Sequence, residues 1–466
     1  MVGVSGIRGI VGTDLTPEVI QRYAGAFGRW AARHRPVVVI GRDSRQSGAA
    51  FSRAAIAALG GAGCEVIDVG IAPTPTIQLA VEHHHAGGGI AVTASHNPIE
   101  WNALKFIGPD GIFLDGAEGD RVLALAARDG NAASEGVATL DREAIARHIQ
   151  SVLGLAAIDV SRIKGRRFKV ALDAVRGAGG AVMPALLEQL GCTVQGIGLE
   201  TDGAFPRAPE PVPENLGDLA ALVKRTGADV GIAVDPDVDR LAIVDETGRP
   251  IGEDYTLAFA VRAVLERGTR NAELGASVPT SALPAQRSPF VVCNLSTSLV
   301  VEDATRDCGG ELVRTPVGEV HVARKIKELG APIGGEGNGG VVFPALHVGR
   351  DAPVAAALLL ELLARTGRTV GELVAAAPRY TIVKAKAERG SRDAVRGMKD
   401  GYDALRKRFP DAAADTQDGL RLGWRDRWLH VRPSNTEPII RFIAEGPDPK
   451  TAQHLIEEGR RLCAAS

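Results

Sequence analysis

The sequence predicts an α/β protein with three related mixed-sheet α/β domains in tandem, followed by a C-terminal α+β domain. Three observations support this prediction. The chain has 466 residues, whereas a single hydrophobic core stops growing at roughly 250–300 residues. One pattern of strand, turn, helix, glycine and strand occurs three times along the chain. The residues after about 375 follow a different pattern.

The repeated pattern begins each time with a short apolar run, at residues 37–40, 170–172 and 290–293. A polar or glycine-rich turn, a helical pattern, a glycine and a second apolar run follow. Short continuous apolar runs are typical of parallel strands that are buried on both faces. The starts lie roughly 120–130 residues apart, a sensible spacing for domain-sized repeats. We therefore expect three βαβ units with right-handed crossovers, one in each α/β domain.

The two ends of the chain complete the predicted fold. Thr16 can cap a helix whose first turn contains Pro17. The apolar stripe of that helix is formed by Val19, Ile20, Tyr23, Phe27 and Trp30. Near the other end, two apolar strands at 428–431 and 439–443 enclose a polar loop, which favours an α+β domain. The predicted domains are 1–155, 156–253, 254–373 and 374–466.

The composition argues against several classes of protein. The 54 basic and 56 acidic residues give a net charge of −2, so neither nucleic acid nor a membrane is an expected partner. The five cysteines are scattered, which argues against a disulfide framework and a structural zinc site. The N-terminus lacks the features of a signal peptide, and no apolar run approaches the ~20 residues that span a bilayer. We expect a cytoplasmic enzyme.

The first candidate for chemistry is the segment Thr-Ala-Ser-His-Asn-Pro at 93–98, which follows an apolar run. A serine at a strand end, before a loop that proline restricts, is held outward on a stiff backbone, as a nucleophile should be. Ser95 occupies that position. An ordinary polar turn is an equally good interpretation of this segment alone. A hydrolase with His96 as the base for Ser95 has weak support, because sequence neighbours rarely align as a Ser–His pair and no Gly-x-Ser-x-Gly elbow is present.

The second candidate is the acidic segment 235–240, which follows the apolar run 230–234. Its carboxylates at Asp235, Asp237 and Asp239 can converge on one cation if the chain stays extended. Three hard oxygen ligands without histidine or cysteine nearby favour Mg²⁺. A solvated acidic turn is the alternative interpretation. An EF-hand is not expected, because its glycine and its final glutamate are absent.

Two further loops carry groups that suit a sugar phosphate. The glycines of 334–340 let the backbone approach a ligand closely, and Glu336 and Asn338 can receive sugar hydroxyls. The loop 432–438 can bind a phosphate through an arginine fork, hydroxyls and turn amides. Its polar side chains are Arg432, Ser434, Asn435 and Thr436. Each loop by itself could also be a plain turn. A turn near the N-terminus adds the guanidinium of Arg8.

In this order, the four loops resemble those of the α-D-phosphohexomutase superfamily, which includes phosphoglucosamine mutase, phosphomannomutase and phosphoglucomutase. The resemblance covers the whole chain, and the segments 93–98 and 235–240 are highly specific to it. The sequence Gly-Glu-Gly-Asn-Gly-Gly at 335–340 looks like the archaeal-type glucosamine/mannose branch. This chain has Gly340 where family members often have a histidine. One histidine is thereby removed from any acid–base scheme.

The resemblance implies a reversible conversion of hexose 6-phosphate into hexose 1-phosphate, with glucosamine phosphate preferred and mannose and glucose phosphates next. A phosphoserine at position 95 would give its phosphoryl group to the substrate and produce a hexose 1,6-bisphosphate. That intermediate would turn and return its other phosphate to the serine, inside a central cleft that the four domains enclose. Hexose 1,6-bisphosphate would also prime the serine. The expected protein is a monomer or homodimer.

The resemblance also implies a role for each candidate residue. The metal ligands would be Ser95, Asp235, Asp237 and Asp239. The catalytic group would comprise Ser95 with Arg8, His96, Lys105 and Arg240. Lys105 would exchange a proton with the sugar hydroxyl, which requires that its pKa be lowered beside the metal. Glu336 and Asn338 would hold the sugar, and the loop that begins at Arg432 would hold the phosphate that is not transferred.

Two other functions stay open on the residues. In a Mg²⁺-dependent sugar-phosphate phosphatase, the first aspartate of an Asp-x-Asp pair would be the nucleophile and Ser95 would be dispensable. A non-enzymatic phosphosugar sensor is less favoured, because the serine and all three carboxylates are intact.

Overall fold

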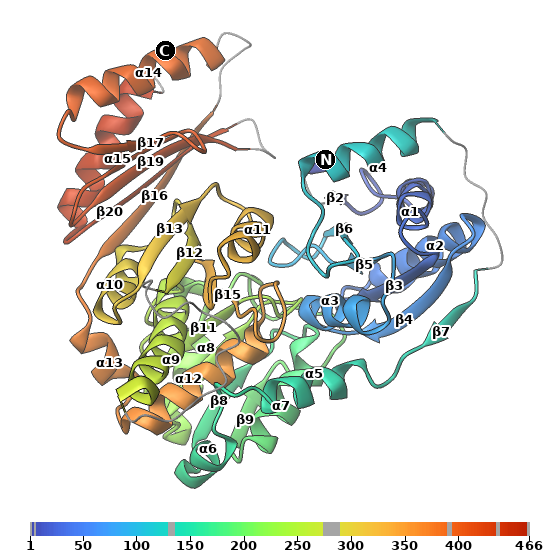
Figure 1. Ribbon diagram of the computed structural model, residues 1–466, viewed down its shortest axis with the longest axis horizontal. Helices are drawn as coiled ribbons and strands as arrows, with labels where there is room; N and C mark the ends of the chain where they lie inside the picture. The colour runs from blue at the N-terminus through green and yellow to red at the C-terminus, as the bar shows by residue number, and fades with distance from the viewer. Residues whose placement is uncertain are drawn as a thin grey trace.

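The computed structural model describes residues 2–3, 6–128, 136–273, 289–388, 394–434 and 439–463. Their strands form four sheets, and Figure 1 shows the corresponding domains along an arc, from the first in blue to the last in red. Three sheets are mixed and the fourth is antiparallel. The predicted fold class is therefore confirmed. All strands of each sheet lie within one of the four segments predicted as domains, although the limits of the domains stay a prediction.

The first sheet has the strand order β1-β2-β6-β5-β3-β4-β7. Its strands are β1 (Val2–Gly3), β2 (Gly6–Ile10), β3 (Val37–Arg42), β4 (Glu65–Ile71), β5 (Gly88–Val92), β6 (Trp101–Ile107) and β7 (Ala138–Leu140). The helices of this part are α1 (Pro17–Ala31), α2 (Gly48–Gly61), α3 (Thr74–His83), α4 (Gly116–Arg128) and α5 (Ala144–Leu153). Strands β3, β4 and β5 are parallel, whereas β6 runs antiparallel to β5. The predicted apolar run at 37–40 is the fully buried part of β3.

The second and third sheets repeat the central four strands of the first. The second consists of β8 (Lys169–Asp173), β9 (Thr193–Ile197), β10 (Val230–Val234) and β11 (Leu241–Val244), with helices α6 (Val160–Arg166), α7 (Gly179–Gln189) and α8 (Gly217–Thr226) and the 3₁₀ turn η1 (Pro213–Asn215). The third consists of β12 (Phe290–Asn294), β13 (Glu311–Thr315), β14 (Ile333–Glu336) and β15 (Gly340–Val342), with α9 (Asp254–Glu273), α10 (Leu299–Asp307), α11 (Glu319–Leu329), α12 (Ala352–Thr366) and α13 (Val370–Ala376).

In all three sheets the first strand of the repeat lies between the second and third, and the fourth strand is antiparallel beside the third. Each of the three predicted βαβ units is present, as β3-α2-β4, β8-α7-β9 and β12-α10-β13, with parallel pairing of its strands. The connection from the third to the fourth strand is a short loop each time. The three domains are thus copies of one plan, and these loops are equivalent in position.

The fourth sheet has the order β16-β20-β19-β18-β17, and every pair in it is antiparallel. Its strands are β16 (Thr381–Glu388), β17 (Ala413–Asp415), β18 (Leu420–Gly423), β19 (Trp428–Pro433) and β20 (Ile439–Gly446), with helices α14 (Ala394–Arg408) and α15 (Pro449–Cys463). Both apolar segments predicted as C-terminal strands are strands, namely β19 and β20. Figure 1 shows α14 and α15 on the outer side of this sheet.

The second and third domains share one hydrophobic core, which the division of the sequence into separate repeats did not predict. Helix α12 is responsible. It is apolar on almost its whole circumference and buried along nearly its whole length, as expected of a helix that contacts protein on every side. It packs against α9 of its own domain and also against α6 and α7 of the second domain. The metal-binding and sugar-binding candidates therefore belong to two domains that pack around one hydrophobic core.

Helix α1 follows the prediction from its cap to its core. The Thr16 hydroxyl accepts a hydrogen bond from the Val19 amide (3.4 Å). Ile20, Phe27 and Trp30 are buried, while Val19 and Tyr23 lie half-buried at the edge of the core.

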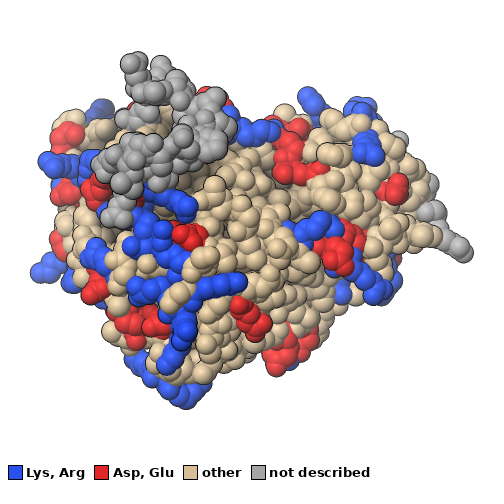
Figure 2. All heavy atoms as spheres, turned by 60° about the horizontal axis from the view of Figure 1, so that its bottom comes forward, with Lys and Arg blue, Asp and Glu red and all other residues tan. Residues whose placement is uncertain are grey.

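In the part of the chain that the structure describes, no helix is long and apolar enough to cross a membrane. Figure 2 shows basic and acidic side chains intermingled on one face of the molecule.

Asp141, which follows β7, accepts hydrogen bonds from Arg147 of α5. This contact predicts how the stability of the protein depends on pH. Burial favours a higher pKa, but hydrogen bonds from Arg147, His84 and the Glu143 amide lower the Asp141 pKa from 3.8 to about 2. Because the folded-state pKa lies below the unfolded value, the carboxylate stabilises the fold above the unfolded pKa and this contribution is lost as the pH falls through the folded pKa. We expect Asp141→Asn to lower the Tm by about 1–2 °C at neutral pH, since the ion pair is partly solvated. The difference from wild type should shrink as the pH falls from about 4 to about 2.

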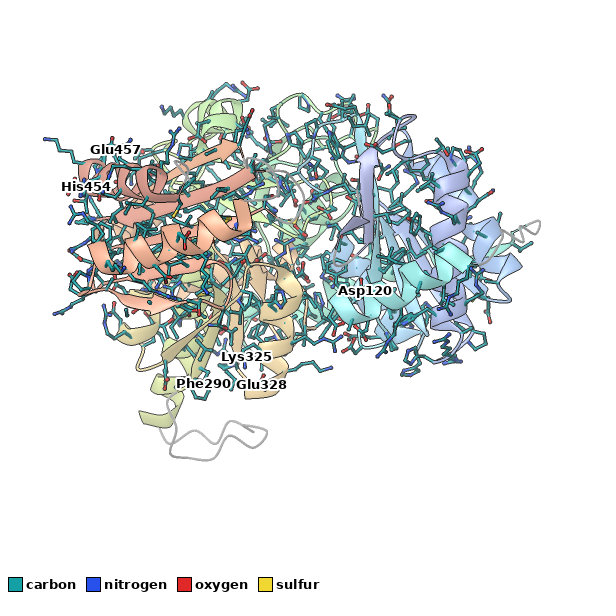
Figure 3. All side chains as sticks on the ribbon, turned by 90° about the horizontal axis from the view of Figure 1, so that it is seen from above. Asp120, Phe290, Lys325, Glu328, His454 and Glu457 are labelled. Carbon is teal, nitrogen blue, oxygen red and sulfur yellow. The ribbon has the colours of Figure 1, made fainter. Side chains whose placement is uncertain are left out.

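The control for this prediction is Asp120→Asn on α4, whose exposed side chain Figure 3 labels. Thermal unfolding by circular dichroism across that pH range provides the measurement. A difference in Tm that is the same at pH 3 and pH 7 would contradict the prediction.

Candidate active site

The three candidate loops of the α/β domains occupy the same place in their sheets. The serine loop joins β5 to β6, the acidic loop joins β10 to β11, and the loop of Glu336 joins β14 to β15. In each domain this is the connection from the third strand of the repeat to the antiparallel fourth strand. The repeat therefore supplies one functional loop from each domain, and hydrogen bonds within and between the domains join the three loops in one site.

Ser95 lies in a strained backbone conformation in the serine loop. Its φ is +48°, in the left-handed region that side chains avoid at a cost of about 1–3 kcal/mol. Its amide donates to the Thr93 hydroxyl (2.9 Å), and that hydroxyl donates to Asp43 Oδ2 (2.6 Å). The Ser95 hydroxyl donates to Asp235 Oδ2 at 2.7 Å. The loop thus presents the serine oxygen directly to the acidic loop of the next domain.

A buried arginine holds the serine loop in this shape. The guanidinium of Arg45 donates to four backbone carbonyls at 2.6–2.8 Å. These carbonyls belong to Ser95, Asn97, Pro98 and Trp101. The charge of Arg45 is balanced by Asp43, whose Oδ2 accepts from Arg45 Nε at 3.1 Å. Arg45 is almost fully buried, and its five N–H groups all donate to acceptors of the protein. The loop is therefore pre-organised before any substrate binds.

The acidic loop is curled rather than extended, so this part of the expectation from the sequence is wrong. Val238 has a φ of +62°, which is rare for a β-branched residue. The Val238 amide donates to the Asp235 carbonyl (3.1 Å) and closes a turn. The Asp239 and Arg240 amides donate to Asp235 Oδ1 at 3.1 and 3.2 Å. The three carboxylates converge because the loop turns back on itself.

Each of the three aspartates has a separate partner. Asp235 accepts from Ser95, as described above. Asp237 Oδ2 accepts from Lys105 Nζ (2.7 Å) and from the Thr74 hydroxyl (2.8 Å). Asp239 Oδ2 accepts from Arg350 at 2.6 Å. All three carboxylates are buried, and one oxygen of each lies within 4.8 Å of one oxygen of the other two.

The electrostatics of this cluster favour a bound cation. Burial raises the pKa of Asp235 well above its ordinary value, and repulsion from Asp239 and Asp237 adds to the effect. Among the described residues, Asp237 Oδ1 and Asp239 Oδ1 are buried without a hydrogen-bond partner. An orphaned buried carboxylate oxygen is costly, and a hard divalent cation removes that cost. Three converging carboxylates and the serine oxygen form the all-oxygen donor set that suits Mg²⁺. The residues therefore fit the predicted metal.

The pKa of Lys105 is set by two carboxylates where no cation is bound. Burial lowers it, but the carboxylates of Asp237 and Asp239 outweigh burial and leave the pKa above its ordinary value. Asp237 lies at 2.7 Å and Asp239 at 3.7 Å from the ammonium nitrogen. Without a cation beside the carboxylates, Lys105 is therefore a positive charge and a proton donor.

The remaining catalytic candidates surround the serine loop. Arg8 on β2 donates to the Asn97 side chain at 3.0 Å. His96 Nδ1 lies 3.3 Å from the Ser95 hydroxyl, a Ser–His contact that their adjacency in sequence had made improbable. Burial and the charge of Arg240 hold the pKa of His96 well below its ordinary value. Arg240 in turn contacts Glu210 at 3.4 Å and Asp239 at 3.8 Å. All these groups belong to one site.

The sugar-binding candidates join the same site through Glu336. Its Oε1 accepts from the Asn294 side chain (2.8 Å) and the Gly318 amide (3.1 Å). Its Oε2 accepts from Arg350 (3.0 Å) and from Asn338 (3.4 Å). Burial favours a higher pKa for Glu336, but Arg350 and these hydrogen bonds keep it below its ordinary value. Glu336 is therefore a fixed, charged acceptor.

The described candidates of the fourth domain connect to this cluster through Asp418. Arg432 on β19 pairs with Asp418 of its own domain at 2.8 Å, and the Ser434 amide donates to the Ile439 carbonyl at 2.9 Å. Asn435 and Thr436 lie outside the described residues. Figure 3 labels His454 and Glu457 of the fourth domain at the upper left of the molecule and Asp120 of the first domain right of its centre. Asp418 Oδ2 also accepts from the Val317 amide (3.2 Å), and the neighbouring Gly318 amide donates to Glu336. The fourth domain is therefore linked to the sugar-binding loop.

Family models match the chain over four consecutive segments. They describe alpha/beta/alpha domains I, II and III of phosphoglucomutase/phosphomannomutase at residues 1–133, 146–248 and 253–380. The C-terminal domain of the same family matches at residues 383–462. This chain belongs to the phosphoglucomutase/phosphomannomutase family. It is therefore an enzyme of the phosphohexomutase class, and the resemblance to this superfamily is confirmed.

The relatives of this phosphohexomutase cover its full length. A phosphoglucomutase/phosphomannomutase of Thermococcus kodakarensis is 38% identical, over 99% of this chain and 98% of its own. A phosphoglucosamine/phosphogalactosamine mutase of Sulfurisphaera tokodaii is 31% identical, over 99% of this chain and 98% of its own. Among solved structures, a phosphoglucomutase/phosphomannomutase family protein of Burkholderia thailandensis superposes with a TM-score of 0.82 at 28% identity. That match covers 99% of this chain and 96% of the other.

Sequence reasoning missed several residues of the mutase site, among them Asp43, Arg45 and Arg350. The first two lie in the turn after β3, which the sequence analysis treated only as the turn of a repeat. Two oppositely charged residues directly after a buried strand were a usable signal, because the ends of neighbouring parallel strands meet at one edge of a sheet. Arg350 lies in a connection between β15 and α12, and no pattern in the sequence distinguished it.

Proposed function

We propose that this phosphohexomutase converts hexose 6-phosphate into hexose 1-phosphate reversibly, with Ser95 as the phosphoryl carrier, Mg²⁺ as cofactor and glucosamine phosphate as the preferred substrate. The observation that carries the proposal is the contact between two domains at the serine. The Ser95 hydroxyl donates to Asp235 at 2.7 Å, and that carboxylate belongs to the buried cluster that fits a divalent cation. A serine oxygen held beside a cation site is suited to take and give a phosphoryl group.

In the first half-reaction, an oxygen of the substrate attacks the phosphorus of phosphoserine 95. The new P–O bond forms on the sugar, the bond to the serine oxygen breaks, and the proton of the sugar hydroxyl ends on the freed serine oxygen. In the second half-reaction the serine oxygen attacks the other phosphate of the hexose 1,6-bisphosphate. When bound at Asp235, Asp237 and Asp239, Mg²⁺ would stabilise the negative charge of the transferring group. The ammonium of Lys105 can return a proton to the sugar oxygen that loses its phosphate.

The other candidates position the substrate in this scheme. Arg8 and Arg240, both beside the serine loop, supply positive charge along the path of the phosphoryl group. His96, held neutral, is an acceptor next to the serine oxygen. Glu336 and Asn338 receive sugar hydroxyls. We assign the phosphate that is not transferred to the loop of the fourth domain, through Arg432, Ser434, Asn435 and Thr436. Because Arg432 and Ser434 belong to a different domain from Ser95, the bisphosphate turns between two anchored orientations.

The sugar preference has support from the loop 335–340 and from the relatives. One relative is named for glucosamine and galactosamine phosphates and another for glucose and mannose phosphates. We therefore propose glucosamine 6-phosphate first, with mannose and glucose phosphates as slower substrates. Hexose 1,6-bisphosphate primes the serine, and we expect the enzyme to act in the cytoplasm as a monomer or homodimer.

Two measurements on the wild-type enzyme test the proposal. Intact-mass spectrometry after incubation with hexose 1,6-bisphosphate should show one added phosphoryl group. Glucosamine, mannose and glucose 6-phosphates, each with Mg²⁺ and bisphosphate, should then give different kcat/KM values. A tenfold preference for glucosamine 6-phosphate corresponds to about 1.4 kcal/mol of differential transition-state binding. Release of inorganic phosphate without hexose 1-phosphate would contradict the mutase assignment.

A further inference from the structure

Arg350 joins the acidic loop to the sugar-binding loop. Its guanidinium donates from one terminal nitrogen to Asp239 (2.6 Å), from the other to Glu336 (3.0 Å), and from Nε to Glu319 (3.0 Å). The three carboxylates come from three different elements and from two domains. Arg350 is buried, and these carboxylates hold its pKa well above the ordinary value, although burial opposes them. One side chain thus aligns groups that the proposed function assigns to the metal and to the sugar.

The backbone of Arg350 is anchored from both sides. Its amide donates to Glu319 Oε1 at 3.1 Å. The next residue, Asp351, caps α12 by accepting from the Val354 amide (2.9 Å). Asp351 Oδ2 also contacts His148 of α5 (2.8 Å) and His347 (3.0 Å), all of them buried. The backbone of Arg350 is therefore fixed. The position of the guanidinium depends on the space through which the side chain runs from that backbone.

Gly340 provides that space. A Cβ atom at position 340 would lie 2.3 Å from Cδ and 3.0 Å from Cγ of Arg350, and contacts under 3.0 Å do not occur between such atoms. The backbone of Gly340 has no positive φ, so its torsion angles allow alanine. The main steric conflict would be with Arg350, and Asn338 Oδ1 would lie at 3.1 Å. The Arg350 side chain cannot swing aside cheaply, because three carboxylates hold its far end.

From these contacts we propose that Gly340 and Arg350 act as one unit, in which the missing side chain at 340 admits a guanidinium that positions Asp239 and Glu336 relative to each other. The inference rests on the proposed function for the roles of those two carboxylates. Because Asp239 Oδ2 accepts a hydrogen bond from Arg350, Asp239 Oδ1 is the oxygen that can bind the cation. It also holds one oxygen of Glu336. It is a positioning residue, whose effect on turnover is exerted through the two carboxylates.

A double-mutant cycle tests this unit. We expect Arg350→Lys to lower kcat/KM by about 10²-fold, because an ammonium cannot fork onto three carboxylates. Gly340→Ala should cause a loss of similar size, because the methyl group displaces the guanidinium. In an Arg350→Ala background, Gly340→Ala should add less than about a twofold loss, since the two residues act together. Losses that multiply in the double variant would overturn the proposal.

Thermal unfolding in the absence and presence of Mg²⁺ gives a second readout that is independent of activity. Without its guanidinium, the Arg350→Gln protein should be less stable without the cation. Mg²⁺ should then raise its Tm by more than it raises that of the wild type, because the dication supplies the missing positive charge. A smaller rise together with lost activity would mean a general collapse of the site and would overturn the positioning role.

Matched controls are Gly165→Ala, where a Cβ meets nothing within 4 Å, and Arg162→Lys, whose partner Glu361 lies outside the site. Both should keep wild-type activity. If Arg350→Ala does not fold, the losses of kcat/KM in Gly340→Ala and Arg350→Lys are compared with each other. Unequal losses would contradict the proposal. If the wild type shows no mutase activity, the proposed function fails, while the cycle measured in Tm still tests the link between Gly340 and Arg350.

Discussion

Replacing Ser95 by alanine is expected to lower mutase turnover by about 10⁴-fold or more, because the covalent route loses its phosphoryl carrier. The change removes one oxygen atom, whose hydroxyl donates to Asp235 at 2.7 Å. The left-handed backbone at position 95 stays in place, since Arg45 and Thr93 hold the loop. Intact mass should show no phosphoryl adduct on this variant, and coupled assays with hexose 6-phosphate and Mg²⁺ should show almost no hexose 1-phosphate.

Ser52→Ala is a suitable control, because Ser52 on α2 is also buried and its hydroxyl has no hydrogen-bond partner among the described residues. It should leave both the adduct and the turnover unchanged. The phosphatase alternative predicts a different result. If Asp235 were the nucleophile, the Ser95→Ala enzyme would keep its full activity and would release phosphate. That outcome would overturn the role of Ser95.

The second large effect is expected at Arg45, whose guanidinium binds Asp43 and the backbone of the serine loop. Arg45→Lys keeps the charge beside Asp43 but loses the fork that binds four carbonyls of the serine loop. A misplacement of about 1 Å can cost roughly 10²-fold in rate, so we expect kcat to fall by about 10²–10³-fold with a smaller change in KM. A lysine ammonium has three donors against five for arginine, and some of these buried carbonyls would lose their partner. Steady-state kinetics at saturating bisphosphate provides the measurement.

Arg365→Lys on α12 is the matched control, because Arg365 also binds a carboxylate and a backbone carbonyl but lies outside the site. Its kinetics should equal those of wild type. Equal losses in both variants would mean that any arginine-to-lysine change harms this fold. A rise in KM alone for Arg45→Lys would contradict a role in shaping the serine loop.

The local elements of the fold were predictable because their causes are local. Thr16 and Pro17 begin α1, and short apolar runs become β3, β8 and β12 with parallel partners. Periodicity and capping depend on neighbours a few residues away, so the sequence contains them. The candidate loops were predictable for a related reason: each follows directly from a buried strand, and that strand fixes where the loop lies.

The corrections concern interactions between distant residues. The acidic loop was expected to be extended, but Val238 turns it back, and the carboxylates converge through the turn. Lys105 faces Asp237 and Asp239, whose carboxylates raise its pKa where no cation is bound. No local pattern indicates that a lysine on β6 of one domain faces an aspartate 132 residues later.

The sequence by itself determined that the chain is a four-domain phosphohexomutase with a serine loop, an acidic loop and a sugar loop, because each depends on a short segment and the strand before it. Tertiary structure alone decided how those loops are held. Arg45 reaches residues 50 to 56 positions away, and Arg350 reaches Asp239 across 111. Gly340 shows the difference most clearly. In the sequence it is a glycine where family members often have a histidine. In the fold, its missing side chain leaves room for the side chain of Arg350. Packing between domains creates such space, and no single segment encodes it.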